Sequence, residues 1–447
     1  MGPAVRAKVL VVGSGYVGTV TAVCLAWLGH EVVGFDVDET RVGQLQCGQL
    51  PFFEPRLAEL LRDTLDSGLL RFTADPRSAS LAQFLFLCVG TPPAPGGRPD
   101  MTQVEQAVRM LVPWVESGAV IVDKSTVPVG SGDWVRTIVE DALAPGHPGV
   151  FCVVSNPEFL REGSMIEDFL HPDRIVLGGD TADTARVASL YERVLAQDFP
   201  GGRRQRRPRL VEITRPSAEM TKYAANAFLA TKISFANEIA AVCELVGADA
   251  REVLPAVGLD QRIGQAFLHH GLGWGGSCFG KDVSALVAMA SDYGYHSPIL
   301  RAATEVNQRQ RAGVLRKLQA ELKILKGKRV GVLGLAFKAG TDDLRDSPAL
   351  DVIQRLLAAG AVVAAYDPIV KELREVDVEG LRIAADPYDA AERADALVVA
   401  TEWPAFGDLD FCRLAERMRG RFILDGRGVI DPPSARAAGF SLRGFGW

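Results

Sequence analysis

The sequence predicts an α/β fold in which two Rossmann-like, doubly wound lobes are joined by a long central helix and a helical middle domain. A strand–turn–helix–strand pattern occurs near the N-terminus and again after Lys328, and a long helical pattern lies between the two. At 447 residues the chain is also too long for one ordinary core. We therefore expect three domains, at residues 1–205, 210–320 and 326–447.

The first lobe begins with a complete β-α-β unit. Lys8 to Val12 is apolar and β-branched, which predicts a buried strand, and a glycine-rich turn and an Ala/Val/Leu helix ending near Gly29 follow it. A second strand at 31–35 is closed by Asp36. Further strands are expected at 85–89, 119–123 and 153–155, with helical segments between them. This alternation predicts a parallel sheet.

The same N-terminal stretch offers a competing interpretation. The run from Val9 to Gly29 carries no charge and resembles a signal peptide or a membrane span. Gly13, Gly15 and Gly18 interrupt it near its middle, which favours a strand, a turn and a helix. We therefore expect no membrane segment there.

The middle of the chain, residues 217–247, is helical in pattern and has no internal glycine or proline before Gly247. Its apolar residues lie on neighbouring faces, which suits packing against a second subunit as well as packing within one chain. We expect a homodimer through this helix, or a larger homo-oligomer. The arginine-rich stretch 201–209 has no apolar face and is interpreted as an exposed loop rather than a nucleic-acid-binding arm.

The second lobe repeats the pattern of the first. Strands are predicted at 329–335 and 362–366 with a helix at 347–359 between them, and Asp367 closes the second strand. Later strands are expected at 396–400 and 422–425.

Composition excludes several classes of function. The net charge of −6 argues against a nucleic-acid partner or an anionic membrane surface. Seven scattered cysteines form no CxxC pair, and no Cys/His cluster has zinc spacing, so no metal site is expected. Free thiols without a pairing pattern favour a reducing, cytoplasmic location.

The glycine-rich turn predicts a dinucleotide site. Gly13 permits the tight turn, Gly15 lets the backbone approach a pyrophosphate, and Gly18 lets helix and strand pack closely. Tyr16 and Val17 begin the helix whose N-terminal N–H groups face the phosphates. Asp36 suits ribose hydroxyls and repels a 2′-phosphate, which favours NAD over NADP. Arg41 is a candidate phosphate or adenine contact, and Thr91 and Thr126 follow strands on the nicotinamide side.

A second glycine-rich segment, residues 273–282, contains the candidate nucleophile Cys278. We expect the glycines to let a substrate approach the backbone closely. A helical pattern from Lys281 would place Cys278 just before a helix N-terminus, where the helix dipole and Lys281 favour the thiolate. A thiolate beside NAD can attack an aldehyde, lose a hydride to give a thioester, and release a carboxylate by hydrolysis. A buried small hydrophobe is the alternative interpretation of a lone cysteine.

Two pairs of residues spaced four apart are candidate helpers. Lys222 and Asn226 share a face of the central helix and could bind a developing oxyanion. Glu158 and Glu162 are carboxylates, one of which could activate a hydrolytic water. Without Cys278, all four would be interpreted as surface residues.

Several separated motifs together resemble the UDP-glucose/GDP-mannose dehydrogenase family. In order along the chain they are GSGYVG, VGTPP, KSTVPVG, SNPEFLREG, HPDRIVLG, EMTKYAANAFLATKISFANEIA, GWGGSCFGKD and GLAFKAGTDDLRDSP. The resemblance extends from Val9 to about Arg427 and is closest to the UDP-glucose branch.

The resemblance implies roles by position. Cys278 matches the nucleophile; Lys222, Asn226 and Asp282 match residues that assist oxidation and stabilise oxyanions. Glu162, with Thr126 and a water, matches the hydrolytic apparatus, and Glu158 is a second carboxylate. Implied substrate contacts, besides Lys222 and Asn226, are Phe159, Leu160, Arg161, Glu162, Arg262 (from a neighbouring subunit), Phe267, Gly275, Lys338 and Arg427. Implied cofactor contacts include Thr91, Thr126, Glu162, Lys281 and Arg345.

The implied reaction is the oxidation of UDP-glucose to UDP-glucuronate by two NAD. The alternatives are oxidation of GDP-mannose or another nucleotide sugar, a two-electron alcohol dehydrogenase, and a silent NAD-binding scaffold. Lys338 and Arg345, beside the second lobe's turn, suit a diphosphate substrate. Two positions depart from the family pattern: Gly280 stands where proline is common, and Gly428 where asparagine is.

Overall fold

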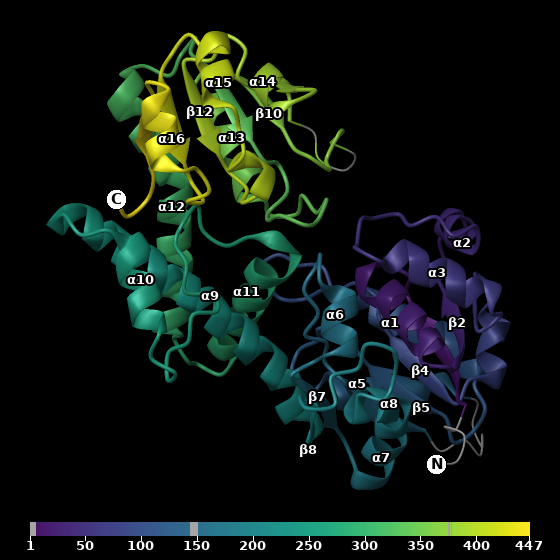
Figure 1. Cartoon of the computed structure of the whole chain (residues 1–447). Helices are drawn as coiled ribbons and strands as arrows, with labels where there is room; N and C mark the ends of the chain where they lie inside the picture. Colours follow the sequence, from purple (N-terminus) through teal and green to yellow (C-terminus); the bar gives the residue numbers. More distant parts are fainter. Residues whose placement is uncertain (1–5, 144–150, 374–375, 377) are drawn as a thin grey trace. The chain divides into compact units, whose positions relative to one another are not determined.

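A computed structural model describes residues 6–143, 151–373, 376 and 378–447. It divides into two compact units, Met1–Ala225 and Asn226–Trp447, and the helix α9 (Arg215–Val246) contributes residues to both. The predicted α/β class, with two sheets and a helical middle region, is confirmed (Figure 1). The three domain boundaries expected from the sequence remain a prediction.

The first unit contains one eight-stranded sheet in the order β3-β2-β1-β4-β5-β6-β7-β8. Neighbouring strands are parallel except β6 and β7, which are antiparallel. The strands are β1 (Lys8–Val12), β2 (Glu31–Phe35), β3 (Leu70–Thr73), β4 (Phe84–Leu87), β5 (Val120–Asp123), β6 (Cys152–Ser155), β7 (Arg174–Gly178) and β8 (Arg209–Ile213). The predicted parallel sheet is therefore confirmed apart from one pair.

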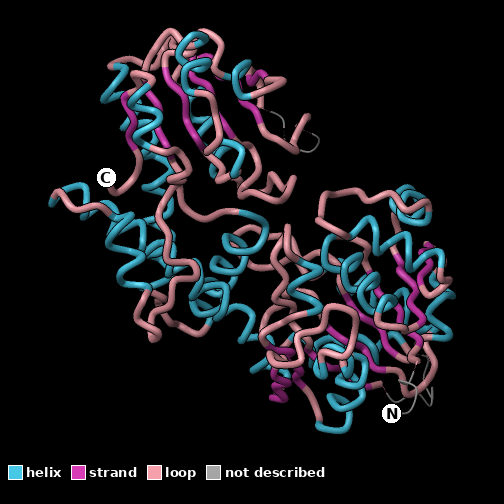
Figure 2. Tube along the Cα trace, in the orientation of Figure 1, coloured by secondary structure: helices cyan, strands magenta, loops and turns pink. Residues whose placement is uncertain are grey.

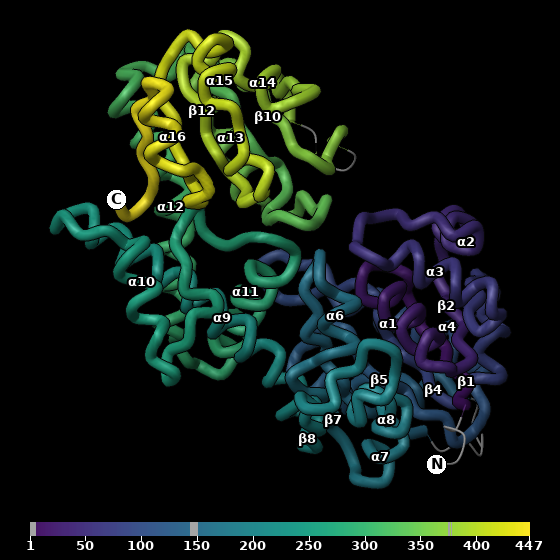
Figure 3. The backbone as a smooth tube through the Cα atoms, viewed as in Figure 1, coloured from purple at the N-terminus to yellow at the C-terminus, as the bar shows by residue number. Residues whose placement is uncertain are grey.

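Helices cover both faces of this sheet, as Figure 2 shows. Successive residues of β1 point to opposite faces, so Val9 and Val11 pack in one core and Leu10 and Val12 in another. The first core includes α1 (Tyr16–Trp27), α3 (Leu57–Asp66) and α6 (Met165–Leu170), and α1 contacts both of the others (Figure 3). The second includes α4 (Thr102–Leu111) and α5 (Ser131–Ala142). The remaining helices of this unit are α2 (Glu39–Gln46), α7 (Thr181–Leu190), α8 (Glu192–Ala196) and the 3₁₀ turns Pro76–Leu81 and Val112–Trp114.

The strand order reverses at β1, which lies between β2 and β4. In an open α/β sheet the crevice at the carboxyl ends of such strands is where ligands bind. The glycine-rich turn after β1 and the Val89–Pro93 segment after β4 both lie at this edge. The membrane interpretation of the N-terminus is wrong, because the uncharged run folds as β1, a turn and α1. Among the described residues, no helix has the length and apolarity needed to cross a bilayer.

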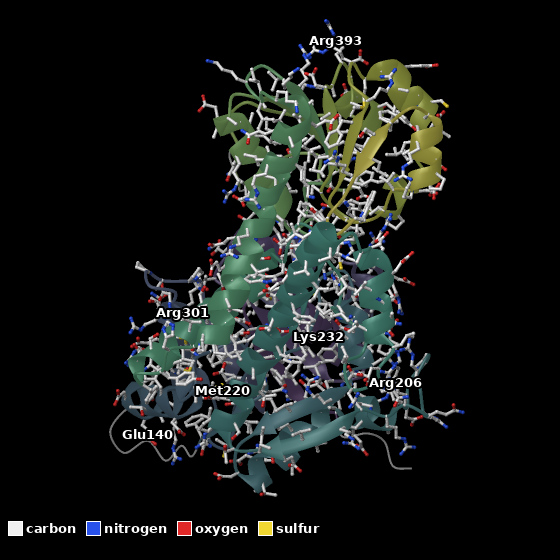
Figure 4. The ribbon with its side chains drawn as sticks, turned by 90° about the vertical axis from the view of Figure 1, so that its left-hand side faces the viewer. Glu140, Arg206, Met220, Lys232, Arg301 and Arg393 are labelled. Atoms are coloured by element: carbon white, nitrogen blue, oxygen red, sulfur yellow. The ribbon has the colours of Figure 1, made fainter. Side chains whose placement is uncertain are left out.

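The arginine-rich stretch 201–209 is an exposed loop up to the start of β8, as predicted. Its arginines pair with acidic residues of the same unit: Arg203 with Glu167, Arg204 with Asp198, and Arg206 with Asp173. Figure 4 shows Arg206 at the surface. This local neutralisation fits a solvated loop better than a binding arm for a polyanion.

The second unit combines helices with a six-stranded, wholly parallel sheet in the order β11-β10-β9-β12-β13-β14. Its strands are β9 (Arg329–Leu333), β10 (Val362–Tyr366), β11 (Leu381–Ile383), β12 (Ala396–Val399), β13 (Phe422–Asp425) and β14 (Ser441–Arg443). Its helices besides α9 are α10 (Ala250–Gly258), α11 (Gly276–Asp292), α12 (Pro298–Leu322), α13 (Pro348–Ala358), α14 (Pro387–Ala390), α15 (Phe411–Arg417), α16 (Pro432–Ala437) and the 3₁₀ turn Pro404–Phe406.

The 25-residue helix α12 lies mostly within the helical middle domain predicted at 210–320, although its own bounds were not predicted from the sequence. Its N-terminal half is rich in arginine and glutamine, so no clear apolar stripe marks it. Val314 and Leu318, near its C-terminal end, are fully buried and join the core of the second sheet with Leu356 of α13. Tertiary packing on the sheet therefore fixes a helix whose own pattern is weak.

Candidate active site

The glycine-rich turn after β1 has the geometry that a dinucleotide needs. Gly13 has φ +93°, in the left-handed region that favours glycine. A Cβ on Gly18 would lie 1.8 Å from the carbonyl oxygen of Gly13, so only glycine lets α1 approach the strand this closely. A Cβ on Gly15 would meet no atom within 4 Å, which leaves its backbone open to a pyrophosphate. Tyr16 and Val17 begin α1 directly after this open position.

Asp36 lies at the carboxyl end of β2 and is 7% exposed. Its carboxylate accepts hydrogen bonds from the N–H groups of Ser14 (2.7 Å) and Asp38 (3.0 Å), which fix it beside the turn. Arg41 contacts the same carboxylate at 3.2 Å and also lies 3.6 Å from Asp38. Arg41 therefore adjoins the expected adenosine side through an ion pair. A carboxylate has further acceptor sites, so ribose hydroxyls remain compatible with Asp36.

Two loops at the carboxyl ends of β4 and β5 are tied together. The hydroxyl of Thr91 donates to the carbonyl oxygen of Thr126 at 2.8 Å. The hydroxyl of Ser125 lies 2.8 Å from the carbonyl oxygen of Val89. The structure thus brings together the two threonines that the sequence assigned to the nicotinamide side.

Lys222 and Glu158 form a buried ion pair within the first unit. Their side chains are 4% and 6% exposed, and Lys222 Nζ lies 2.7 Å from Glu158 Oε1. Burial acts to raise the pKa of Glu158, but the Lys222 ammonium, the Leu160 N–H and Lys124 together outweigh it and lower that pKa. Glu158 is therefore ionised at neutral pH. Such a pair holds the Lys222 ammonium in a fixed position, as the expected oxyanion role requires, and that role stays a prediction.

A small cavity adjoins this pair and is lined by Asp123, Ser125, Thr126, Val127, Ser155, Pro157, Glu219 and Lys222. Asp123 is 2% exposed, and neither of its carboxylate oxygens has a hydrogen-bond partner among the described residues. Burial raises the pKa of Asp123 well above its usual value, and the charge of Glu219 raises it further. Burial therefore favours the protonated form of Asp123 in the folded protein, relative to an aspartate in water.

This assignment predicts how stability depends on pH. A carboxyl group whose folded pKa is raised binds more protons when folded than when unfolded, so its contribution to stability falls as pH rises from its unfolded value of about 4. Replacing Asp123 with asparagine removes that loss. We expect the gain in midpoint temperature of the variant over the wild type to be larger at pH 8 than at pH 5. Thermal unfolding at the two pH values checks this, and an equal difference at both would contradict it.

The segment between β6 and α6 carries Glu158 and Glu162. The carboxylate of Glu54, which is 4% exposed, accepts the N–H groups of Gly163 (2.7 Å) and Met165 (2.8 Å) and anchors the end of this segment. Glu162 directly precedes the anchored Gly163 and is partly buried. Glu54 was not predicted from the sequence, because a buried carboxylate that binds a distant backbone has no local pattern.

The other substrate candidates of this segment make contacts within the unit. The Phe159 ring lies under the Arg174 guanidinium at 4.0 Å and near Lys222 Nζ at 5.7 Å. Arg161 forms an ion pair with Asp168 at 2.6 Å, and Leu160 donates its N–H to Glu158. The backbone of this stretch is therefore fixed around the Lys222–Glu158 pair.

In the second unit, Cys278 is partly buried in the first turn of α11. The expectation that the helix begins at Lys281 is wrong, since α11 begins at Gly276 with Gly275 as its N-cap. Glycine has a poor helix propensity, and that made the run look like a loop. The positive end of the helix therefore lies closer to the thiol than expected. The hydroxyl of Ser277 lies 3.4 Å from the thiol sulfur.

Asn226, Asp282 and Lys281 form a polar cluster in the same unit. The amide of Asn226 donates to Asp282 Oδ2 at 2.6 Å, and Lys281 Nζ lies 2.9 Å from Asp282 Oδ1. Asp282 is fully buried. The carboxylate thus orients both the amide on α9 and the ammonium on α11.

The glycines before Cys278 pack against this unit's own chain, which is a reason for glycine separate from the expected approach of substrate, and that approach stays a prediction. A Cβ on Gly273 would lie 2.2 Å from Asn307 Oδ1, and one on Gly275 would lie 2.2 Å from the carbonyl oxygen of Asp346. A Cβ on Gly276 would lie 2.7 Å from the Phe337 ring. Close intrachain packing therefore requires glycine at all three positions. Gly280 lies inside α11, so the helix continues through this departure from the family pattern.

The remaining substrate candidates also lie in the second unit. Arg427 donates to the carbonyl oxygen of Ala400 at 2.9 Å and lies 3.3 Å from Glu402. Arg345 pairs with Asp343, Lys338 lies 5.3 Å from the Phe337 ring centroid, and Arg262 is 89% exposed beside Asp260. Phe267 has φ +62°, which is strained for an aromatic residue and common at functional sites.

Gly428 has φ +69°, and its N–H donates to Asp425 Oδ1 at 2.8 Å. Asparagine and glycine are the residues that adopt this left-handed conformation most readily. The departure at Gly428 therefore preserves the turn, although it removes a side chain.

Three domains of one family match the chain in order. The NAD binding domain of the UDP-glucose/GDP-mannose dehydrogenase family matches residues 7–195, its central domain residues 216–309, and its UDP binding domain residues 331–432. The chain belongs to this family. The resemblance inferred from the motifs is thereby confirmed, as is an NAD-binding domain in the first unit.

Individual family members are similar over nearly the whole length. A UDP-glucose 6-dehydrogenase of Rhizobium meliloti is 44% identical over 98% of this chain and 99% of its own, and one of Bacillus subtilis is 41% identical over 98% and 93%. The structure of a UDP-glucose dehydrogenase from Pyrobaculum islandicum superposes with a TM-score of 0.91 at 37% identity, and covers all of both chains. The family's fold therefore extends through both units.

Proposed function

We propose that this protein oxidises UDP-glucose to UDP-glucuronate, with two NAD and one water consumed per turnover. The observation that carries the proposal is the 44% identity to a UDP-glucose 6-dehydrogenase over 98% of the chain. The open glycine turn at Gly15, Asp36 and the buried Lys222–Glu158 pair support it. Free cysteines fit a reducing cytoplasm as the place of action.

In this proposal, the turn at Gly13, Gly15 and Gly18 and the Asp36 carboxylate would hold NAD, which would supply the hydride acceptor for both oxidations. The first hydride leaves carbon 6 of the glucose as the hydroxyl loses its proton, which gives an aldehyde. The Cys278 thiolate then adds to the aldehyde carbon and forms a thiohemiacetal. Loss of the second hydride and the hydroxyl proton gives a thioester.

Hydrolysis completes the reaction. A water held by Thr126 and activated by Glu162 attacks the thioester carbon, the carbon–sulfur bond breaks, and the acid and the thiolate are released. Lys222 and the Asp282-oriented Asn226 stabilise the negative charge that develops on the oxygen of carbon 6. Lys338, Arg345 and Arg427 supply cations to the nucleotide and cofactor sides. We propose that these roles are divided among three domains: NAD binding at residues 1–205, a central helical domain at 210–320, and nucleotide-sugar binding at 326–447.

The stoichiometry of the cofactor tests this function. With limiting UDP-glucose, we expect two NADH and one UDP-glucuronate per sugar consumed. One NADH per sugar would instead identify a two-electron alcohol dehydrogenase. The absence of NADH would identify a catalytically silent NAD-binding scaffold. Parallel assays with GDP-mannose and the N-acetyl-hexosamine nucleotides test the sugar, and a higher kcat/KM for any of these would overturn UDP-glucose as the substrate.

We further propose a homodimer that forms through α9. Phe228 (65% exposed), Phe235 (49%) and Val242 (47%) recur at seven-residue intervals and form an apolar stripe on this helix. Such a stripe exposed on a helix is typical of helix–helix association. The helix can be found in Figure 4 by its labelled residue Lys232.

Replacing Phe235 with glutamate is expected to convert the dimer to a monomer, because a charge would be buried in the apolar interface. Analytical ultracentrifugation at micromolar protein measures the change. The control is Leu81→Glu, which alters another exposed apolar residue (60%) in the first unit. A Phe235 variant that stays as associated as the control would contradict the proposal.

A further inference from the structure

Glu219 is a buried carboxylate that begins the EMTKYAANAFLATKISFANEIA motif and to which the sequence analysis assigned no role. It lies on α9, three residues before Lys222, and is 3% exposed. It also lines the small cavity that contains Thr126 and Lys222. Glu219 therefore lies beside both Thr126, the expected hydrolytic residue, and Lys222, the expected oxyanion partner.

Both oxygens of Glu219 accept hydrogen bonds from the strand ends and loops beside α9. Oε2 accepts the N–H of Gly130 at 2.6 Å, and Oε1 accepts the N–H of Gly132 at 2.9 Å. Oε1 also accepts the hydroxyl of Ser155 at 2.9 Å. These bonds connect α9 to the loop after β5, to the first turn of α5 and to the end of β6.

The close approach at α5 depends on a glycine. A Cβ on Gly132 would lie 2.9 Å from Arg215 Cδ and 3.1 Å from both Glu219 Oε1 and Ser155 Oγ. A larger residue would therefore push the carboxylate away from the N–H groups that it binds. The hydrogen bonds of Glu219 to this turn therefore depend on glycine at position 132.

Five other charged or titratable groups surround this site. Asp123 at the end of β5 faces the same cavity, and its raised pKa limits the repulsion that Glu219 would otherwise meet. Asp133 of α5 is paired with Arg215 of α9 at 2.7 Å, and Lys222 is paired with Glu158. Each of these groups except Asp123 therefore has an ionic partner other than Glu219. The Glu219 carboxylate keeps its hydrogen bonds to Gly130, Gly132 and Ser155.

We propose that Glu219 is a positioning residue that clamps the Thr126 loop against the turn of α9 that carries Lys222. This role rests on the proposed function, in which Thr126 holds the water that hydrolyses the thioester. Residues 124–130 form the loop; Thr126 is near its start, and its end is bound by Glu219. Lys222 is held separately by Glu158, so loss of the clamp moves the loop and leaves the ammonium in place.

The clamp should therefore affect one half of the reaction. A displacement of about 1 Å in a positioned group can lower a rate by about a hundredfold. Oxidation depends on Lys222 and Cys278, whereas hydrolysis depends also on the water at Thr126. Weakening the clamp should slow release of the acid more than formation of the acyl-enzyme.

Glu219→Gln tests this directly. Its amide has one acceptor oxygen, so the NH₂ group would face a backbone N–H that it cannot bind. We expect kcat to fall about tenfold or more, with KM for both substrates changed less than about threefold. Rapid-quench mass spectrometry during turnover should show a larger fraction of enzyme acylated at Cys278 than in the wild type. Glu219→Asp, which keeps both acceptor oxygens, should lie between the two.

The matched control is Glu140→Gln on α5, the helix whose first turn Glu219 binds. The Glu140 side chain is 66% exposed and lies at the surface (Figure 4). If Glu219→Gln does not fold by circular dichroism, Ser155→Ala removes one contact without changing charge, and should raise the acylated fraction in the same direction. An acylated fraction equal to those of the wild type and Glu140→Gln, in whichever variant folds, overturns the clamp. A wild type that never acylates overturns the proposed function instead, and the role of Glu219 with it.

Discussion

Replacing Cys278 with serine is expected to lower turnover by about a thousandfold or more. Serine has nearly the same size, but its hydroxyl is a far weaker nucleophile at neutral pH than a thiol at a helix N-terminus. Cys278 lies in the first turn of α11, where the positive end of the helix dipole favours the thiolate. Steady-state NADH production measures the loss, and calorimetric titration should show nucleotide-sugar binding changed less than about threefold.

The control is Cys412→Ser, an exposed free cysteine on α15 of the same unit. It should turn over like the wild type, because it lies outside the proposed chemistry. Wild-type turnover by the Cys278 variant would remove this residue from the mechanism.

The second large effect is expected for Lys222→Ala, which should lower kcat by about a hundredfold to a thousandfold while KM changes little. Lys222 is 4% exposed and 2.7 Å from Glu158, so its charge is held where water cannot replace it. A charge that stabilises only the developing oxyanion raises kcat and contributes little to ground-state binding. Steady-state kinetics with varied UDP-glucose separates the two quantities.

The same substitution leaves the Glu158 carboxylate buried without its partner, which is expected to cost about 3–5 kcal/mol of stability. The double variant Lys222→Ala/Glu158→Gln removes the orphaned charge and should recover most of the lost midpoint temperature. It should not recover turnover. If the double variant regains both, Lys222 acts through folding alone, and the oxyanion role is wrong.

The sequence predicted the parts of this protein that local patterns determine. Strands such as β2 and β10 agree with their predicted ranges residue by residue, because apolar β-branched runs and turn residues mark both of their ends. Gly13, Gly15 and Gly18 were assigned correctly to a tight turn, an open approach and a close packing contact. Lys222 and Glu158 were each selected, although their pairing was not foreseen.

Long-range contacts explain what the sequence did not reveal. Glu54 and Glu219 bind backbone N–H groups 109 and 89 residues away, and no local spacing signals such a bond. The start of α11 was missed because its glycines have low helix propensity, yet Asn307, Asp346 and Phe337 leave no room for a side chain there. Likewise, Val314 and Leu318 of α12 pack into the core of the second sheet with residues distant in the chain, a contact that no local pattern reveals.

The covalent role of Cys278 is tested most directly by intact-mass spectrometry of wild-type enzyme, quenched in acid within the first turnovers with UDP-glucose and NAD. We expect a species heavier than the free enzyme by one UDP-glucuronyl group, with the added mass on the peptide that contains Cys278. The adduct should be absent from the serine variant. No such adduct at any quench time, together with a free aldehyde accumulating in solution, would contradict the account.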